Sequence, residues 1–181
     1  MTVHVRSEHA RGTAAARRLR QRACRYLVAL GREDAEVSIL VVGDAAIRRL
    51  NRTWGGKDRP TDVLSFPQAE VSRAPRAVGS AGPAIPAPRP AHPLLGDIVI
   101  SLDTATRVAR RDGRTVGAEL DRYLAHGLLH LVGYDHQRAE DASLMAAEED
   151  ALVGEGMLRG LEGEHEERRE ASPAGSRSTS R

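Results

Sequence analysis

Hydrophobic and polar residues alternate in several short segments of the chain, and each of these segments predicts a β-strand. Alternation at Thr2–Arg6 predicts a first strand, and the apolar, β-branched run Glu36–Val42 predicts a second, buried one. Two further strands are expected at Thr61–Phe66, which is bounded by prolines, and at Asp97–Ser101. These four strands are enough for a small sheet.

Apolar residues recur at helical spacing between and after the predicted strands. A first helix is expected at about Thr13–Leu30, before Gly31, and a second from Asp44, as its N-cap, to Gly55. Three more helices are expected at about Asp103–Arg111, Val116–Val132 and Ala139–Leu152. About five helices packed on a mixed four-stranded sheet define an α+β fold in a single domain.

Length and composition agree with one domain and two poorly structured segments. The 181 residues are 40% hydrophobic but only 3% aromatic, so the core should be aliphatic. The domain is expected at residues 1–160, with a proline- and alanine-rich insertion at about 69–93 and a disordered polar tail at 161–181. The chain has no apolar run of membrane-spanning length, no signal-peptide pattern and a single cysteine, so we expect a cytoplasmic protein.

Positive charge is distributed unevenly, although the formal net charge is only +2. Between His9 and Arg32 the chain has no acidic residue and six arginines: Arg11, Arg17, Arg18, Arg20, Arg22 and Arg25. Such a run either attracts the phosphates of nucleic acid or forms the solvated face of an ordinary helix. Acidic residues near 148–150 and 162–170 argue against RNA lying across the C-terminal region.

Three of the seven histidines lie within eleven residues, at a spacing typical of metal ligands. His126 and His130 share one face of a helix, whereas His136 can join them only if the helix ends, which Gly133 permits. Three imidazoles with an open fourth position suit catalytic zinc, which lowers the pKa of bound water to about 7; nickel, copper and cobalt accept the same ligands. Gly127 stands where the metalloprotease motif H-E-x-x-H has its general base, so the base must come from elsewhere.

Three blocks of the sequence resemble the signatures of the YbeY family, bacterial rRNA maturation factors described as metal-dependent endoribonucleases. The histidine segment His126–His136 resembles one of them. A second comprises Leu50-Asn51 followed by Gly56–Pro67, and a third is Leu95–Ser101. Together the blocks span about Leu50 to His136, in the family's order.

This resemblance implies a function, a cofactor and partners. It makes His126, His130 and His136 the ligands of one Zn²⁺ per chain. It implies a zinc-dependent single-strand endoribonuclease that acts in rRNA maturation, at the 3′ end of the small-subunit rRNA, and in ribosome quality control. The implied partners are single-stranded rRNA precursor, small-subunit components of the ribosome and an assembly GTPase, with no role for a membrane.

Several other residues are candidates for the catalytic site. Asp135, beside His136, would orient a ligand imidazole or accept a proton, although a turn-forming or capping role explains it equally well. Lys57 and Arg59 are candidates to bind the phosphodiester and to stabilise negative charge in the transition state. Asp62, in the same block, is expected on a strand that borders the site.

One departure from the family pattern leaves alternatives open. Where the family commonly has an arginine before Gly-Lys-Asp, this chain has Gly55, so Arg52, Lys57 or Arg59 would have to take over its task. One alternative function is therefore a zinc-containing ribosome-assembly factor with weak or no catalysis. Another is a metal-dependent hydrolase of a different substrate class, such as a peptidase, which the missing glutamate disfavours.

Overall fold

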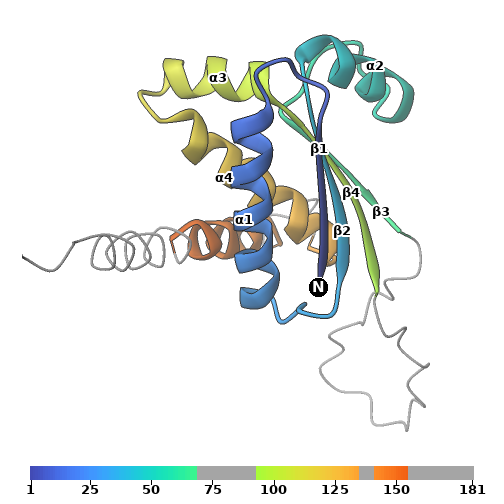
Figure 1. Cartoon of the computed structure of the whole chain (residues 1–181), viewed down its shortest axis with the longest axis vertical. Coiled ribbons are helices and arrows are strands. Elements are labelled where there is room, and N and C mark those ends of the chain that lie inside the picture. The colour runs from blue at the N-terminus through green and yellow to red at the C-terminus, as the bar shows by residue number, and fades with distance from the viewer. Residues whose placement is uncertain (69–92, 135–140, 155–181) are drawn as a thin grey trace, which may run out of the picture.

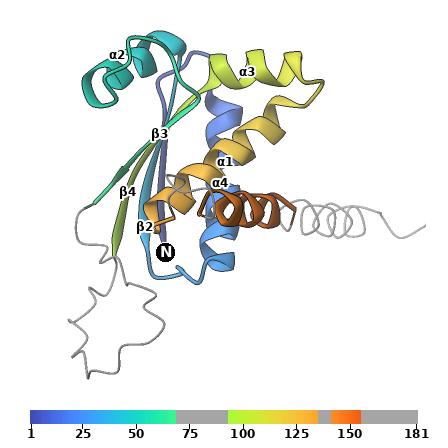
Figure 2. The same cartoon turned by 180° about the vertical axis from the view of Figure 1, so that it is seen from behind.

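The fold is a mixed β-sheet with helices on both faces (Figures 1 and 2). The computed structural model describes residues 1–68, 93–134 and 141–154. Within these residues the chain forms four strands and five helices, which confirms the predicted α+β fold. The predicted tail lies outside the described residues, as does all of the predicted insertion except residue 93.

The sheet has the order β1-β2-β4-β3. Its strands are β1 (Thr2–Ser7), β2 (Glu36–Val42), β3 (Val63–Pro67) and β4 (Leu94–Ser101). The first three strands in this order are parallel, and the edge strand β3 runs antiparallel to β4, with Ser65 opposite Ile98. The sheet is therefore mixed, as predicted.

Two strands begin at other residues than the sequence predicted. The third strand begins at Val63 rather than Thr61, because the carboxylate of Asp62 accepts hydrogen bonds from the Thr61 hydroxyl and the Val63 amide and forms a turn. The fourth begins at Leu94 rather than Asp97, because pairing with β2 continues to that residue.

The helices divide between the two faces of the sheet. They are α1 (Thr13–Ala29), α2 (Asp44–Trp54), α3 (Leu102–Arg111), α4 (Val116–Leu131) and a further helix at residues 141–154. The main core, built largely from aliphatic side chains, lies between the sheet and helices α1 and α4. A smaller cluster of Val42, Ile47 and Val99 lies on the opposite face, under α2. Within the described residues we find no helix long and apolar enough to cross a membrane.

The run of arginines in α1 and just before it divides into two groups. Arg18 and Arg22 form ion pairs with Asp121, a buried carboxylate of α4. The hydrogen bonds that Arg18 donates to Asp121 raise the pKa of its guanidinium and hold α1 against α4. The other four arginines, at positions 11, 17, 20 and 25, are exposed. Two arginines of the run therefore stabilise the fold, a role that neither alternative included.

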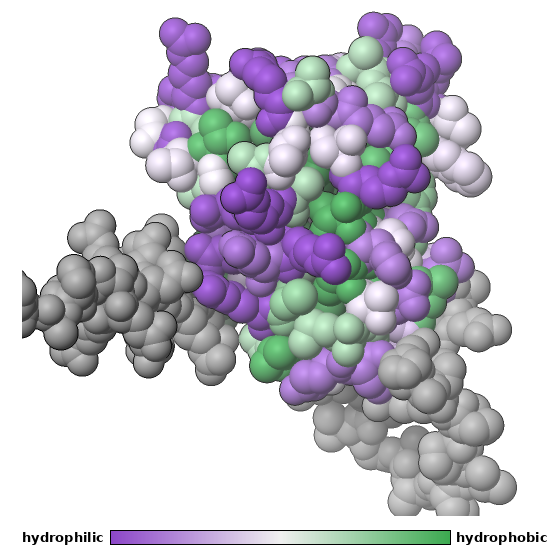
Figure 3. All heavy atoms as spheres, in the orientation of Figure 1, coloured by the Kyte–Doolittle hydropathy of each residue, from purple (hydrophilic) through white to green (hydrophobic). Residues whose placement is uncertain are grey.

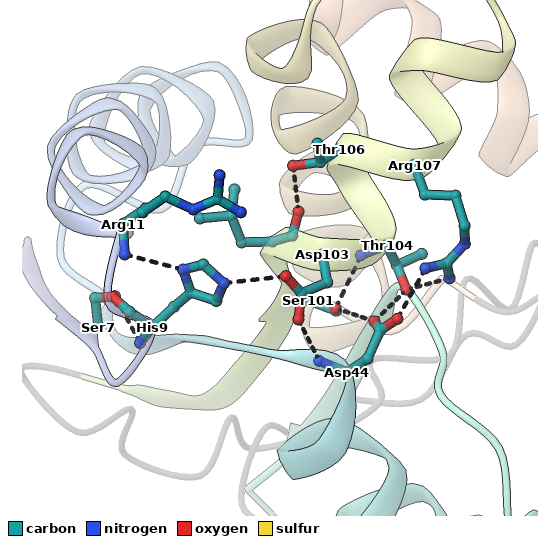
Figure 4. Close-up of polar contacts among 10 residues, drawn as sticks. Ser7, His9, Arg11, Asp44, Ser101, Asp103, Thr104, Thr106 and Arg107 are labelled. Atoms are coloured by element: carbon teal, nitrogen blue, oxygen red, sulfur yellow. Dashed lines mark hydrogen bonds and ion pairs between the residues drawn. The ribbon is translucent and has the colours of Figure 1, made fainter.

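A network of hydrogen bonds, here called the polar tie, joins the starts of α1, α2 and α3 (Figure 4). Its members are His9, Asp44, Ser101, Asp103, Thr104 and Arg107. The carboxylate of Asp44 accepts three hydrogen bonds. The donors are the hydroxyls of Ser101 and Thr104, each at 2.6 Å, and the guanidinium of Arg107 at 2.8 Å. Asp103 accepts from the Asp44 amide at 2.9 Å and lies 3.0 Å from Nε2 of His9.

The polar tie corrects one prediction about α2. The N-cap of α2 is Gly43, which has extended backbone, and Asp44 is the first residue of the helix. The carboxylate of Asp44 turns to the polar tie instead of capping its own helix. Its negative charge still lies at the helix N-terminus, where the helix dipole favours it.

Candidate metal centre

Two of the three predicted ligands lie one turn apart near the C-terminal end of α4. The Nε2 atoms of His126 and His130 are 3.1 Å apart, and the ring centroids are separated by 4.7 Å with the planes at 80°. Their spacing of four residues brings both rings to one face of α4, as predicted. The side chain of His126 is 35% exposed, so a substrate can approach the pair from solvent.

The Nδ1 atom of each imidazole, which lies away from the other ring, contacts an oxygen of the protein. Nδ1 of His126 lies 3.2 Å from a carboxylate oxygen of Glu149, and Nδ1 of His130 lies 3.1 Å from the backbone oxygen of Tyr134. The other carboxylate oxygen of Glu149 lies 3.5 Å from Nε of Arg122, one turn before His126 on α4. These contacts fix the direction in which both Nε2 atoms point.

The partners of the Nδ1 atoms determine where the protons lie. A carbonyl or carboxylate oxygen accepts a hydrogen bond, so each neutral ring carries its proton on Nδ1 and a lone pair on Nε2. With the protons on Nδ1, the two Nε2 atoms of His126 and His130 face each other at 3.1 Å, an arrangement in which one cation can bind both nitrogens. Two nitrogens at about 2.0–2.1 Å from a tetrahedral zinc ion are separated by about 3.3 Å. The pair thus fits a zinc ion in distance and in protonation.

The end of α4 agrees with the predicted route to the third ligand. The helix ends at Leu131, and Gly133 has a φ of 99°, a left-handed conformation that favours glycine. The amide of Tyr134 donates to the carbonyl of Leu129 at 3.0 Å and closes the helix end. His136 and Asp135 lie outside the described residues, and their predicted roles stay predictions.

The small residue between the two histidines has a packing reason. A Cβ at Gly127 would lie 3.0 Å from Cγ2 of Ile98 and 3.2 Å from Oγ of Ser65, so α4 lies directly against β3 and β4 there. A glutamate would have to enter this contact, which explains why position 127 supplies no general base. Ser65, from the second signature block, donates a 3.4 Å hydrogen bond to the Gly127 carbonyl. The block therefore does border the histidine pair.

The sequence did not reveal the role of Glu149. We interpreted its acidic surroundings only as a region unfavourable to RNA. Its contact with His126 spans 23 residues, so no local pattern reports it. The available signal was chemical: histidines that bind metals usually donate their second nitrogen to a carboxylate or a carbonyl, and the helix after His136 offers carboxylates.

The predicted phosphate-binding residues lie at a different part of the molecule. Lys57 and Arg59 are exposed in the loop between α2 and β3, at the upper end of the sheet in Figure 1, whereas the histidine half of α4 crosses the sheet lower down. Among the described residues, neither side chain forms a hydrogen bond or an ion pair with the histidines. Asp62 makes turn contacts and lies close enough to Tyr123 of α4 to raise the pKa of that phenol, which burial and Asp62 together bring to about 12. Their catalytic roles stay predictions.

This loop is organised by Asn51, a buried residue of the second signature block for which the sequence indicated no role. Its side-chain amide donates to the carbonyl of Arg59 at 2.8 Å, and its backbone carbonyl accepts from the amides of Gly55 and Lys57. A Cβ at Gly55 would collide with the side-chain and backbone oxygens of Asn51. In this conformation an arginine does not fit at Gly55 unless Asn51 moves.

Comparisons with known proteins define the class of the chain. The sequence model of the family described as Endoribonuclease YbeY matches residues 4–155. The chain is thus an endoribonuclease, a hydrolase that cuts RNA. More specifically, it belongs to the YbeY family.

Individual relatives and a solved structure agree with this assignment. Endoribonuclease YbeY of Anaeromyxobacter sp. (strain Fw109-5) is 59% identical over 159 residues, which cover 87% of this chain and 74% of the relative. Endoribonuclease YbeY of Anaeromyxobacter dehalogenans (strain 2CP-C) is 54% identical over 183 residues, covering 96% and 86%. The solution structure of TM1509 from Thermotoga maritima matches with a TM-score of 0.59 and 25% identity, over 97% of this chain and 100% of that one.

Proposed function

We propose that this chain cleaves single-stranded rRNA precursors in a zinc-dependent reaction, during maturation of the small-subunit rRNA 3′ end and in ribosome quality control. The observation that supports zinc is the pair of Nε2 lone pairs of His126 and His130, which face each other at 3.1 Å. His136 is the proposed third ligand. When bound, zinc would polarise a phosphoryl oxygen and lower the pKa of a water molecule.

The chain's own residues prepare this site in two ways. Glu149 and the Tyr134 carbonyl hold the protons of the two rings on Nδ1, so that both Nε2 atoms can act as ligands without first losing a proton. Lys57 and Arg59 are proposed to bind the phosphates of the RNA. Asp135 is proposed to orient His136 or to accept the proton of the attacking water. Small-subunit components of the ribosome and an assembly GTPase are the proposed partners.

The test measures metal content and RNA cleavage in parallel. Protein purified without added metal is analysed for its elements and incubated with a single-stranded rRNA precursor fragment, with and without a chelator. We expect about one zinc per chain and cleavage that the chelator abolishes and added zinc restores. Another metal in its place, or cleavage that survives complete metal removal, would contradict the proposal.

Two histidine variants test whether the loss of zinc and cleavage is specific to the proposed ligands. His130→Ala is expected to lose zinc and to reduce cleavage by more than the roughly 10- to 100-fold that an outer contact costs. His4→Ala is the matched control, since His4 is exposed on β1 and pairs with Glu36. It should retain both properties. A His130→Ala protein that still cleaves like the control would exclude the site.

A zinc-containing assembly factor with weak or no catalysis is the second candidate, and Gly55 is the observation that favours it. In the family an arginine commonly occupies this position, whereas here Gly55 leaves room for the oxygens of Asn51. If the purified chain binds zinc with His126 and His130 but does not cleave RNA, this second function replaces the first.

A further inference from the structure

The C-terminal end of α2 exposes a tryptophan next to a group of cations. Trp54 is 71% exposed, the largest value among the exposed large hydrophobic residues of the described chain. Four cationic residues lie within five positions of it, on the outer side of α2 and in the following loop, and all are exposed: Arg49, Arg52, Lys57 and Arg59. Figure 3 shows hydrophilic side chains beside paler and hydrophobic ones over α2, at the upper right. We call Trp54 and these four residues the α2 platform.

The indole of Trp54 packs against one other aromatic ring. Its ring meets Phe66 of β3 edge to face, with centroids 6.1 Å apart and planes at 74°. Such contacts between aromatic rings are favourable and restrict the orientation of the indole. Since most of the ring is exposed, this contact leaves aromatic surface open to solvent. Burial in the core therefore does not explain why a tryptophan occupies position 54.

The four cations of the α2 platform are available to a ligand. Within the described residues none of their side chains forms an ion pair, whereas the neighbouring Arg48 is paired with Asp58 at 2.8 Å. The backbone of the loop is nevertheless fixed, because Asn51 binds the carbonyl of Arg59 and the amides of Gly55 and Lys57. Positive charge without ion pairs, on the end of a helix and the fixed loop that follows it, favours a polyanion.

We propose that the α2 platform binds a segment of single-stranded RNA, with one base stacked on Trp54 and the adjoining phosphates paired with Arg49, Arg52, Lys57 and Arg59. Aromatic rings that stack with unpaired bases, next to cations that neutralise the backbone, are the usual means of binding single strands without sequence preference. A base in a duplex is already stacked on both sides and does not offer this contact. The surface therefore selects single-stranded RNA over a duplex.

The position of the α2 platform relates it to the histidine pair. Phe66, beneath Trp54, and Ser65, which contacts α4 next to His126, are consecutive residues of β3 and so point to opposite faces of the sheet. Strand β3 is the edge of the sheet. A single strand bound at the platform can therefore pass around this edge to the histidines. The inference rests on the proposed function in taking RNA as the ligand.

The test uses the fact that Trp54 is the chain's only tryptophan, so its fluorescence reports on this one position. The full chain, with a chelator present to prevent cleavage, is titrated with an unlabelled single-stranded oligoribonucleotide and, separately, with a duplex of the same length. We expect the single strand to quench the emission and to bind more tightly than the duplex. Binding of the single strand without any change in emission would overturn the proposal.

Substitutions test the stacking and the charge separately. Trp54→Ala should weaken binding roughly 5- to 100-fold, measured by anisotropy of a labelled strand, and Trp54→Phe should restore most of the loss. Arg52→Ala should lower the slope of log affinity against log salt by about 0.7, the contribution of one phosphate contact in a single strand. Circular dichroism checks that each variant is folded.

The matched control is Arg20→Ala, which removes an exposed charge from α1, on the opposite side of the sheet. An equal loss from Arg20→Ala and Arg52→Ala would mean non-specific attraction and would overturn the proposal, as would unchanged binding in Trp54→Ala. Binding and cleavage are measured separately, so the two proposals can fail separately. Quenching without metal-dependent cleavage refutes the proposed zinc-dependent reaction alone, whereas metal-dependent cleavage without quenching refutes the α2 platform alone.

Discussion

Two histidine–carboxylate clusters of this molecule differ in how their donors and acceptors balance. In the polar tie, His9 lies against Asp103, and its second nitrogen, Nδ1, accepts from the amide of Arg11 at 3.1 Å (Figure 4). In the candidate metal centre, His126 lies against Glu149, but its second nitrogen faces the lone pair of His130. Both ring nitrogens of His9 therefore contact groups of the polar tie and its flanking loop, whereas Nε2 of His126 faces the same atom of a second histidine.

This difference separates a structural role from a ligand-binding one. The three acceptor contacts of Asp44 come from Ser101, Thr104 and Arg107, all within the fold, so the polar tie needs nothing from outside. The histidine pair satisfies its protons internally, yet directs two lone pairs at a common point. A cation at that point can bind both nitrogens. The presence of histidine and carboxylate in a cluster is therefore less informative than the partner of the second ring nitrogen.

The largest effect is expected from a substitution beside the histidine pair, the cluster for which the comparison predicts metal binding. Glu149→Gln removes the charge that faces Nδ1 of His126, and we expect zinc affinity to fall about 10- to 100-fold, the usual cost of losing such an outer contact. Competition with a chromophoric chelator measures the affinity. Glu148→Gln, the neighbour on the same helix, is the control and should leave zinc affinity unchanged. Equal affinities in the two variants would show that Glu149 does not orient the ligand.

A substitution in the polar tie should lower the stability of the fold and leave zinc binding unchanged. Asp44→Ala leaves the buried Ser101 and Thr104 hydroxyls without their acceptor, so we expect the free energy of unfolding to fall by about 2 kcal/mol. Urea denaturation measures this, and zinc content should not change. Asp58→Ala breaks an exposed pair with Arg48 and should cost at most about 1 kcal/mol. If the two variants lose the same amount, the polar tie is no more than surface pairing.

The same comparison shows which features were predictable from the sequence. The strands and helices were predictable because their signals are local, such as alternation in Glu36–Val42 or the spacing of four residues between His126 and His130. The left-handed Gly133 was predictable for the same reason. The contacts that distinguish the two clusters span 94 residues for His9 with Asp103 and 23 for His126 with Glu149. Such contacts depend on how the helices pack, which no local pattern contains.

Charge was harder to interpret from the sequence than hydrophobicity. The run of arginines around α1 left a phosphate-binding surface and a solvated helix face as alternatives, but Arg18 and Arg22 bind the buried Asp121, a residue that lies about 100 positions later in the chain. Likewise, Asp44 was predicted as an N-cap from its position alone, and its carboxylate instead binds side chains of α3 and β4. A charged residue takes its role from its partner, which the sequence does not name.

A smaller effect is expected from the packing that positions the histidine pair. Gly127→Ala places a methyl group 3.0 Å from Ile98 and 3.2 Å from Ser65, which must give way by a few tenths of an ångström. We expect a loss of about 1–2 kcal/mol in the free energy of unfolding, measured in urea, together with weaker zinc binding. The control is Gly154→Ala, where a Cβ meets nothing within 4 Å and helix propensity favours alanine. A stable Gly127→Ala protein would show that α4 can shift without cost.

The smallest expected effect is a loss of stability in acid, which follows from the lowered pKa values of two carboxylates in the polar tie. Burial alone would raise the pKa of Asp44, but hydrogen bonds from Ser101, Thr104 and Arg107 more than offset this and lower it. The pKa of Asp103 is lowered chiefly by the backbone amide of Asp44 and further by His9. Both carboxylates therefore bind a proton less readily in the folded chain than in the unfolded one.

The sign of the pH dependence follows from these lowered pKa values. The stability that the two carboxylates contribute is fully present above their unfolded pKa of about 3.9 and is lost as the pH falls through the lower folded pKa. We expect the urea midpoint to fall on acidification from about pH 5, and to fall less in Asp44→Asn, which has no proton to bind at this position. An Asp44→Asn protein with the same acid slope as the original chain would show that the polar tie does not couple folding to pH.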